Sequence, residues 1–105
     1  MELSVKNCRQ DDRAVVAVVG EIDLSNSRQL QDQINAAVGV DGVVGVVVDL
    51  SGVTFMDSSG ISALLWGRRV ADAAGKQYQV VGADGVARQI LDVTGVWTHL
   101  AGPAG

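Results

Sequence analysis

A run of apolar residues, mostly valine, occupies positions 43–50 (VVGVVVDL) in the middle of the chain. A nearly continuous run of this kind is typical of a central strand that is covered on both faces. Apolar residues at helical spacing follow it over positions 61–71. We therefore expect a buried strand that leads into a helix, with the junction between them at residues 57–60 (DSSG).

The N-terminal part of the chain predicts a hairpin. Alternating apolar and polar residues at positions 3–6 indicate a short strand, and the polar residues 9–13 (RQDDR) indicate a turn. A valine-rich second strand follows at residues 14–20.

A first helix is expected after this hairpin. Residues 25–27 (SNS) are of the types that cap helices, and Asn26 with Gln29 loosely resembles a capping box. Apolar residues then recur at helical spacing until Gly39 ends the helix. The helix after the central strand ends near Gly75 in the same way.

The C-terminal part completes an α/β pattern. Residues 78–81 predict another strand, Asp84 can cap a third helix, and residues 96–100 predict a short last strand. The order ββαβαβα(β) implies a mixed, mostly parallel sheet of four to five strands with an N-terminal hairpin and crossover helices. We expect a single domain over residues 1–100 and a short flexible tail at 101–105.

Composition narrows the class of function. The chain has 105 residues, enough for one core, and a net charge of −4 without a basic stripe, which argues against nucleic acid as a partner. The single cysteine, Cys8, excludes an internal disulfide and a multi-cysteine metal site. No signal peptide and no stretch of membrane-spanning length is visible, so we expect a cytoplasmic protein that does not contact a membrane.

The junction at residues 57–60 carries a carboxylate and two hydroxyls where a strand gives way to a helix. α/β proteins place their working groups at such turns. Asp57 or Ser58 can serve as the N-cap, and Gly60 lets the chain pass close to its neighbours. A phosphate on a serine here would meet unpaired N–H groups and the positive end of the helix dipole. Taken alone, the same residues also fit a plain helix start.

Three segments of the chain form an ordered set: residues 20–23 (GEID), 53–61 (VTFMDSSGI) and 90–96 (ILDVTGV). The set resembles the STAS-domain anti-sigma factor antagonists, also called anti-anti-sigma factors, of bacterial sporulation and stress signalling. The resemblance runs from Leu3 to Leu100, and its most specific part is the FMDSSG sequence. It implies the STAS fold for this chain.

The resemblance also implies a phosphorylation switch. In that family the first serine of the junction, here Ser58, is phosphorylated by the partner anti-sigma factor, which is itself a serine kinase; Ser59 is the second choice. The unphosphorylated antagonist binds the anti-sigma factor and frees the sigma factor. The phosphorylated form cannot bind, and a PP2C-type phosphatase removes the phosphate and so restores the binding form. Asp23 matches an acidic family position near the acceptor serine, and Asp57 directly precedes Ser58 in the sequence. The kinase would hold ATP and Mg²⁺, so we expect no cofactor or metal in this chain. We also expect the chain to be a monomer or weak dimer.

Trp66 is a further candidate for contact with the partner. On a helical wheel it lies opposite the core residue Leu64, together with Ala63 and Val70. An exposed tryptophan suits an interface anchor, whereas a helix packed on more than one side would bury it, and both readings stay open. The predicted partner-binding residues are Asp23, Asp57, Ser58, Ser59, Gly60 and Trp66.

Three rival functions follow from other residues. A serine hydrolase would need His99, the only histidine, as its base, but no G-x-S-x-G motif is present. A receiver domain would use Asp49 as its acceptor, but the acidic pair and the later lysine that hold Mg²⁺ and the phosphoryl group are not evident. A STAS subunit of a larger assembly, such as a stressosome or a lipid transporter, would not need an acceptor serine. We therefore expect a non-enzymatic switch protein.

Overall fold

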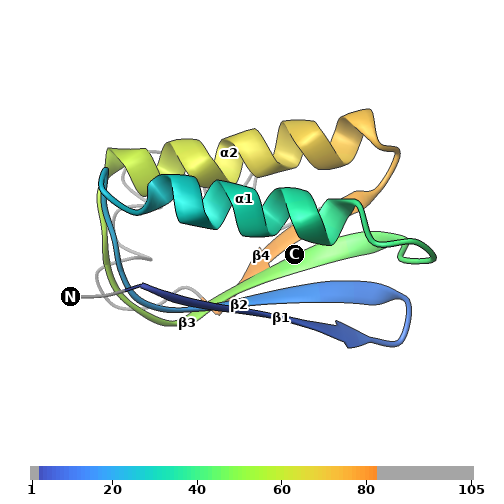
Figure 1. Cartoon of the computed structure of the whole chain (residues 1–105), viewed down its shortest axis with the longest axis horizontal. Coiled ribbons are helices and arrows are strands. Elements are labelled where there is room, and N and C mark those ends of the chain that lie inside the picture. The colour runs from blue at the N-terminus through green and yellow to red at the C-terminus, as the bar shows by residue number, and fades with distance from the viewer. Residues whose placement is uncertain (1–2, 83–105) are drawn as a thin grey trace.

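The computed structural model describes residues 3–82 of the chain (Figure 1). The strands form one sheet in the order β1-β2-β3-β4, which is antiparallel between β1 and β2 and parallel elsewhere. The predicted α/β class, the N-terminal hairpin and the mostly parallel sheet are confirmed. The elements are β1 (Ser4–Gln10), β2 (Arg13–Ile22), α1 (Ser27–Val38), β3 (Gly45–Met56), α2 (Ser58–Ala73) and β4 (Gln77–Val81).

Several predicted features lie outside the described residues. They are the helix that begins at Asp84, the strand at residues 96–100 and the tail at 101–105. The third segment of the family resemblance, residues 90–96, also lies there.

Both helices lie on the same face of the sheet, as Figure 1 shows. The crossovers from β2 to β3 and from β3 to β4 step across the sheet in the same direction, and right-handed crossovers of this kind place their helices on one side. Within the described part, helices lie on only one face of β3, so the expectation of a central strand covered on both faces is not confirmed there. In β3, Val46 and Val48 are buried under the helices, whereas Val47 and Asp49 are only partly buried and Ser51 is exposed.

The core fills the space between this sheet face and the two helices. Alternate residues of β2 and β3 point into it, as a strand period of two requires. The apolar stripe predicted for the first helix is confirmed, because Leu30, Ile34, Ala37 and Val38 of α1 are all buried.

The ends of two strands differ from the prediction. β3 continues through residues 53–56 (VTFM), so that the strand itself delivers the chain to the DSSG junction. The hairpin turn is shorter than expected, because only Asp11 and Asp12 separate β1 from β2. Asp11 has a φ of 56°, a left-handed conformation that aspartate tolerates, and the flanking residues Gln10 and Arg13 pair across the hairpin.

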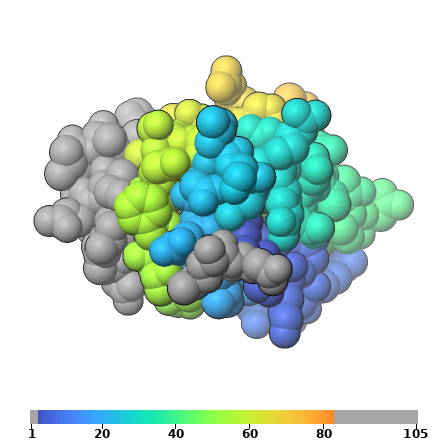
Figure 2. Space-filling view, turned by 60° about the vertical axis from the view of Figure 1, so that its left-hand side comes forward, coloured from blue at the N-terminus to red at the C-terminus, as the bar shows by residue number. Residues whose placement is uncertain are grey.

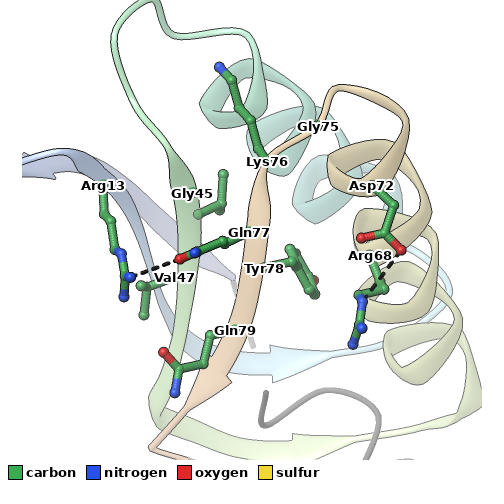
Figure 3. A pocket seen from close by; sticks show the side chains of 11 residues that line it. Arg13, Gly45, Val47, Arg68, Asp72, Gly75, Lys76, Gln77, Tyr78 and Gln79 are labelled. Atoms are coloured by element: carbon green, nitrogen blue, oxygen red, sulfur yellow. Dashed lines mark hydrogen bonds and ion pairs between the residues drawn. The ribbon is translucent and has the colours of Figure 1, made fainter. Parts of the chain in front are cut away.

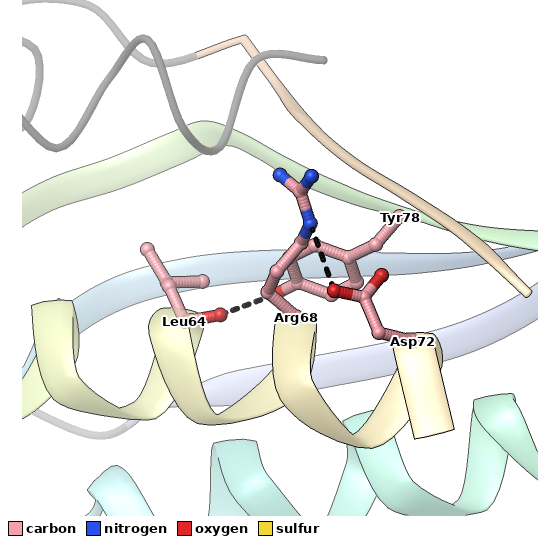
Figure 4. A network of polar contacts seen from close by, with 4 residues as sticks. All are labelled: Leu64, Arg68, Asp72 and Tyr78. Atoms are coloured by element: carbon pink, nitrogen blue, oxygen red, sulfur yellow. Dashed lines mark hydrogen bonds and ion pairs between the residues drawn. The ribbon is translucent and has the colours of Figure 1, made fainter. Parts of the chain in front are cut away.

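α2 lies close to its neighbours at Gly67, a residue that sequence analysis did not single out. A Cβ atom at this position would lie 2.7 Å from the Tyr78 hydroxyl oxygen and 2.9 Å from Cγ2 of Ile34. The buried Tyr78 hydroxyl donates a hydrogen bond to the Leu64 carbonyl oxygen at 2.9 Å (Figure 4). These contacts fix α2 against β4 and α1, and so fix the position at which α2 begins.

Candidate functional site

The candidate site is built on the two turns that follow β2 and β3. Ile22 at the end of β2 pairs with Met56 at the end of β3, and the Asp57 N–H donates to the Ile22 carbonyl oxygen at 3.2 Å. The turns into α1 and α2 therefore share one end of the sheet. Figure 2 shows the segment after β2, in blue, beside the segment after β3, in yellow-green.

Asp57 caps the N-terminus of α2. Its carboxylate accepts hydrogen bonds from the Ser59 N–H at 2.9 Å, the Gly60 N–H at 3.4 Å and the Ser59 hydroxyl at 2.5 Å. The Ser59 hydroxyl is the main reason that the pKa of Asp57 lies below its ordinary value, and the backbone donors add to this lowering while burial opposes it. Asp57 is therefore ionised at neutral pH.

The two serines of the junction differ in accessibility. Ser58 is exposed, and none of residues 3–82 forms a hydrogen bond with its hydroxyl. Ser59 is partly buried, and its hydroxyl donates to Asp57. An enzyme can reach the Ser58 hydroxyl without breaking a hydrogen bond, whereas reaction at Ser59 would first break its hydrogen bond to Asp57, at a cost of about 1 kcal/mol.

Asp57 also changes the surroundings expected for a phosphate at this place. The sequence suggested that a phosphate would meet unpaired N–H groups, but Asp57 already accepts from the N–H groups of Ser59 and Gly60. Two of the N–H groups on which the expectation relied are therefore already paired. A phosphate on Ser58 would instead stand near an ionised carboxylate, and like charges at close range repel each other. Its charge would therefore be added to the surface.

Gly60 lies inside the fold. It is buried, and an added Cβ atom would lie 2.6 Å from Cγ of Met56 and 2.9 Å from Cγ2 of Ile22. The missing side chain lets α2 begin directly against the ends of β2 and β3. Gly60 thus positions Ser58, while a direct contact between Gly60 and a partner stays a prediction.

Asp23 follows β2 as Asp57 follows β3. The Asp23 carboxylate is partly buried and accepts from the Ser25 N–H at 3.0 Å and the Ser25 hydroxyl at 2.5 Å. The Asn26 side chain accepts from the Asp23 N–H and donates to the Glu21 carbonyl oxygen, both at 2.9 Å. The predicted capping box is wrong, because Asn26 makes no side-chain cap hydrogen bond to α1 and uses its amide to close the turn.

Trp66 is partly buried. This is intermediate between the exposed interface anchor and the buried side chain, the two alternatives that the sequence left open. It lies one turn of α2 before Val70, which packs against the core. Ala63, expected on the outer side, is completely buried, because α2 packs against α1 as well as against the sheet. Trp66 therefore stands at the edge of the buried surface, and its contact with a partner stays a prediction.

A cavity of about 560 Å³ lies at the opposite end of the sheet, where β4 begins (Figure 3). The charged side chains that line this cavity form hydrogen bonds and an ion pair with other residues of the chain. Arg13 donates to the Gln77 side-chain oxygen at 2.8 Å, and Arg68 pairs with Asp72 at 3.5 Å. Lys76 donates to carbonyl oxygens at and just beyond the end of α1. We assign these contacts a role in packing.

The structure bears on one of the rival functions, the receiver domain. Asp49 lies well inside β3 and accepts from the Ser51 N–H at 2.9 Å, so it is not at the carboxyl end where parallel sheets place reactive groups. His99 lies outside the described residues. Within residues 3–82, no group of three or more metal-ligating side chains is gathered, and no helix is long and apolar enough to span a membrane.

Known proteins resemble this chain over most of its length. The model of a family described as "Mlab, STAS domain" matches residues 6–101. An anti-sigma F factor antagonist from Lysinibacillus sphaericus is 27% identical over 82 residues, which cover 78% of this chain and 70% of that protein. A crystal structure of an anti-sigma factor antagonist from Mycobacterium paratuberculosis is 27% identical, with a TM-score of 0.83 over 94% of this chain and 83% of that one. The Bacillus cell fate determinant SpoIIAA in its phosphorylated form has the same fold, with 19% identity and a TM-score of 0.69 over 92% of this chain and 88% of that one.

Proposed function

The chain belongs to the STAS domain family, and we propose that it is an anti-sigma factor antagonist controlled by phosphorylation of Ser58. The unphosphorylated protein binds an anti-sigma factor serine kinase in the cytoplasm and thereby releases a sigma factor. The phosphorylated protein does not bind, and a PP2C-type phosphatase reverses the modification. The chain itself performs no catalysis and acts as a monomer or weak dimer.

One observation carries this proposal: the exposed Ser58 hydroxyl at a capped helix start, beside a second serine that is held by Asp57. A kinase acceptor must be reachable by another protein's active site, and Ser58 meets this requirement. The similarity to proteins named anti-sigma factor antagonists, one of them over 94% of the chain, supports the choice of partner.

The proposed reaction transfers the γ-phosphoryl group of ATP to Ser58. A bond forms between the Ser58 oxygen and the γ-phosphorus, the bond between that phosphorus and the bridging oxygen breaks, and ADP leaves. The hydroxyl proton passes to a base of the kinase. The product adds roughly −1.5 to −2 charge next to the ionised Asp57. Like charges brought together across an interface cost several kcal/mol, enough to abolish micromolar binding.

The test combines phosphate mapping with two substitutions at Ser58. Candidate anti-sigma factor kinases are incubated with the protein and ATP, and mass spectrometry should place one phosphate on Ser58. Ser58→Ala should bind the kinase permanently, and Ser58→Asp should bind poorly while its circular dichroism shows an intact fold. Ser59→Ala is the matched control and should still accept phosphate. The proposal fails if Ser58→Ala and Ser58→Asp both bind like the parent.

A second candidate function is a STAS subunit of a larger assembly, such as a stressosome or a lipid transporter, without control of a sigma factor. The family model that matches this chain is described as "Mlab, STAS domain", and this description is the reason to test the second function. In that case the tagged protein should co-purify in stoichiometric amounts with the other subunits of such an assembly, and Ser58→Asp should leave the complex unchanged. Loss of the complex on this substitution would favour the switch.

A further inference from the structure

The turns after β2 and β3 have the same construction. In each, an aspartate follows the last strand residue and accepts hydrogen bonds from the N–H and the hydroxyl of a serine two positions later. The Asp23 carboxylate accepts from the Ser25 N–H at 3.0 Å and the Ser25 hydroxyl at 2.5 Å. The Asp57 carboxylate accepts from the Ser59 N–H at 2.9 Å and the Ser59 hydroxyl at 2.5 Å. The strand residues before them, Ile22 and Met56, are paired in the sheet.

This equivalence gives Leu24 the same place in the first turn that Ser58 has in the second. Each follows its aspartate by one residue, and each is exposed on the same end of the sheet. Leu24 is 80% exposed, the highest value among the exposed large apolar residues of the described part. Within the described residues, Leu24 belongs neither to the core nor to the partly buried residues packed against it, so its apolar side chain is available to a partner.

We propose that Leu24 is the apolar anchor of the surface that docks the kinase, and that it enters an apolar pocket beside the kinase active site. This inference rests on the proposed function and adds a contact to it. The docking surface consists of Leu24 and Ser58 together with Asp23 and Asp57, the aspartates that precede them in the two turns. Because Asp57 is ionised, the partner that fits this surface has an apolar pocket with hydrogen-bond donors or basic side chains at its edge.

The turn that carries Leu24 lies beside the turn that carries Ser58. Neighbouring strands lie about 5 Å apart, and the two turns extend from neighbouring strands. A stable protein interface covers about 800 Å² on each partner, far more than the area of one turn. An interface of this area that is centred on the Ser58 oxygen would include the adjacent turn and Leu24.

The turn holds Leu24 in place before the partner arrives. The Asp23 carbonyl oxygen accepts from the N–H groups of Asn26 and Ser27 at 3.2 and 2.9 Å, and the Asn26 amide ties the turn to β2. A rigid turn loses little conformational entropy on binding, which raises the affinity that an apolar side chain at its tip can supply.

The test measures binding and phosphorylation with the purified anti-sigma factor kinases of the same organism, in the presence of Mg²⁺ and ATP. Leu24→Ser should weaken binding about tenfold or more and raise the KM for phosphorylation of Ser58, with little change in kcat. Leu24→Met, which keeps an apolar side chain, should restore most of the affinity. Val44→Ser is the matched control, because Val44 is 47% exposed near the start of β3, at the opposite end of the sheet.

Each outcome separates this inference from the proposed function. If Leu24→Ser binds like the parent while Ser58→Asp loses binding, Leu24 is not an anchor and the switch stands. If Val44→Ser weakens binding as much as Leu24→Ser does, the effect is not specific and the inference is wrong. Sedimentation measures whether the parent self-associates. If it does, and if Leu24→Ser abolishes the association, Leu24 contacts a second copy of the chain and the inference that it contacts the kinase is wrong. If no kinase binds or phosphorylates the parent, both the anchor and the switch are rejected.

Discussion

Ser58 is accessible because of the residues on either side of it. Asp57 takes the helix N–H groups and the hydroxyl of Ser59, which leaves Ser58 as the exposed hydroxyl of the pair. Gly60 brings the start of α2 against Ile22 and Met56, so the first turn of the helix cannot move away from the strand ends without opening the core. Hydrogen bonding and packing of its neighbours thus leave Ser58, the proposed acceptor, as the accessible serine of the pair.

The Asp57–Ser59 hydrogen bond predicts a pH-dependent loss of stability in Ser59→Ala. The folded-state pKa of Asp57 lies below 3.8, so its contribution is present above that pH and disappears as the pH falls through the folded value. Removing the Ser59 hydroxyl should raise the pKa of Asp57 and lower the free energy of unfolding at neutral pH by about 1 kcal/mol. The measurements are an NMR titration of the Asp57 carboxyl and urea unfolding at neutral pH and well below pH 3.8.

Ser58→Ala is the control for this prediction, because the Ser58 hydroxyl has no hydrogen bond within the described residues. It should leave the pKa of Asp57 and the stability nearly unchanged. An Asp57 titration that is the same in Ser59→Ala and the parent would show that the Ser59 hydroxyl does not lower the pKa.

At the scale of elements, α2 determines where the site stands. The helix packs on α1, β3 and β4 and buries Ala63, Gly67 and Ala71 among its small residues. Small residues let a helix approach its neighbours closely, which is why Gly67 comes within contact of both Tyr78 and Ile34. The depth at which α2 sits against the sheet follows from these positions.

Gly67→Ala should therefore be destabilising, although alanine favours a helix by about 1 kcal/mol over glycine. The added Cβ atom meets the Tyr78 hydroxyl and Ile34 below 3.0 Å, and overpacking of this kind costs about 1–3 kcal/mol. Thermal unfolding followed by circular dichroism measures the loss. Gly39→Ala is the matched control, because its nearest contacts would be at 3.6 Å, and it should shift stability by less than about 0.5 kcal/mol. A Gly67→Ala variant more stable than the parent would contradict the close approach.

At the scale of the whole molecule, the sheet and the two helices of residues 3–82 form two layers, and the ends of β2 and β3 meet the starts of α1 and α2 at one edge of the sheet. Tyr78 connects the layers, because its ring is buried between β4 and α2 and its hydroxyl reaches the α2 backbone. Burial raises the pKa of Tyr78 far above the ordinary value of 10.0, against a smaller lowering by the Arg68 charge.

This burial predicts alkaline destabilisation of the fold. The folded-state pKa of Tyr78 is raised, so its contribution is complete below pH 10.0 and is lost as the pH rises above that value, where the unfolded chain ionises first. The chain has one tyrosine, so tyrosinate absorbance reports this residue alone. It should appear only together with the loss of helical circular dichroism. Tyr78→Phe should cost about 0.5–1.5 kcal/mol at neutral pH and remove the part of the alkaline transition that is due to tyrosine ionisation. Tyrosinate formation near pH 10.0 in a protein that is still folded would contradict the prediction.

The sequence by itself determined the class of the fold, the order of the elements in residues 3–82 and the identity of the junction. Hydrophobic periodicity is a local property, so the stripe of Leu30 and Ile34 in α1 could be read directly. The DSSG residues were readable for the same reason, because capping by Asp57 needs only its immediate neighbours.

The tertiary structure alone decided which surfaces meet. That both helices lie on one sheet face, that Ala63 is buried and that Leu24 is exposed next to Ser58 all depend on how distant segments pack. The two aspartate–serine turns are 34 residues apart in sequence and adjacent in space, since parallel pairing brings Ile22 beside Met56. Local patterns carry no information on such pairings, because a helical wheel or a strand alternation specifies an apolar face but not the element that covers it.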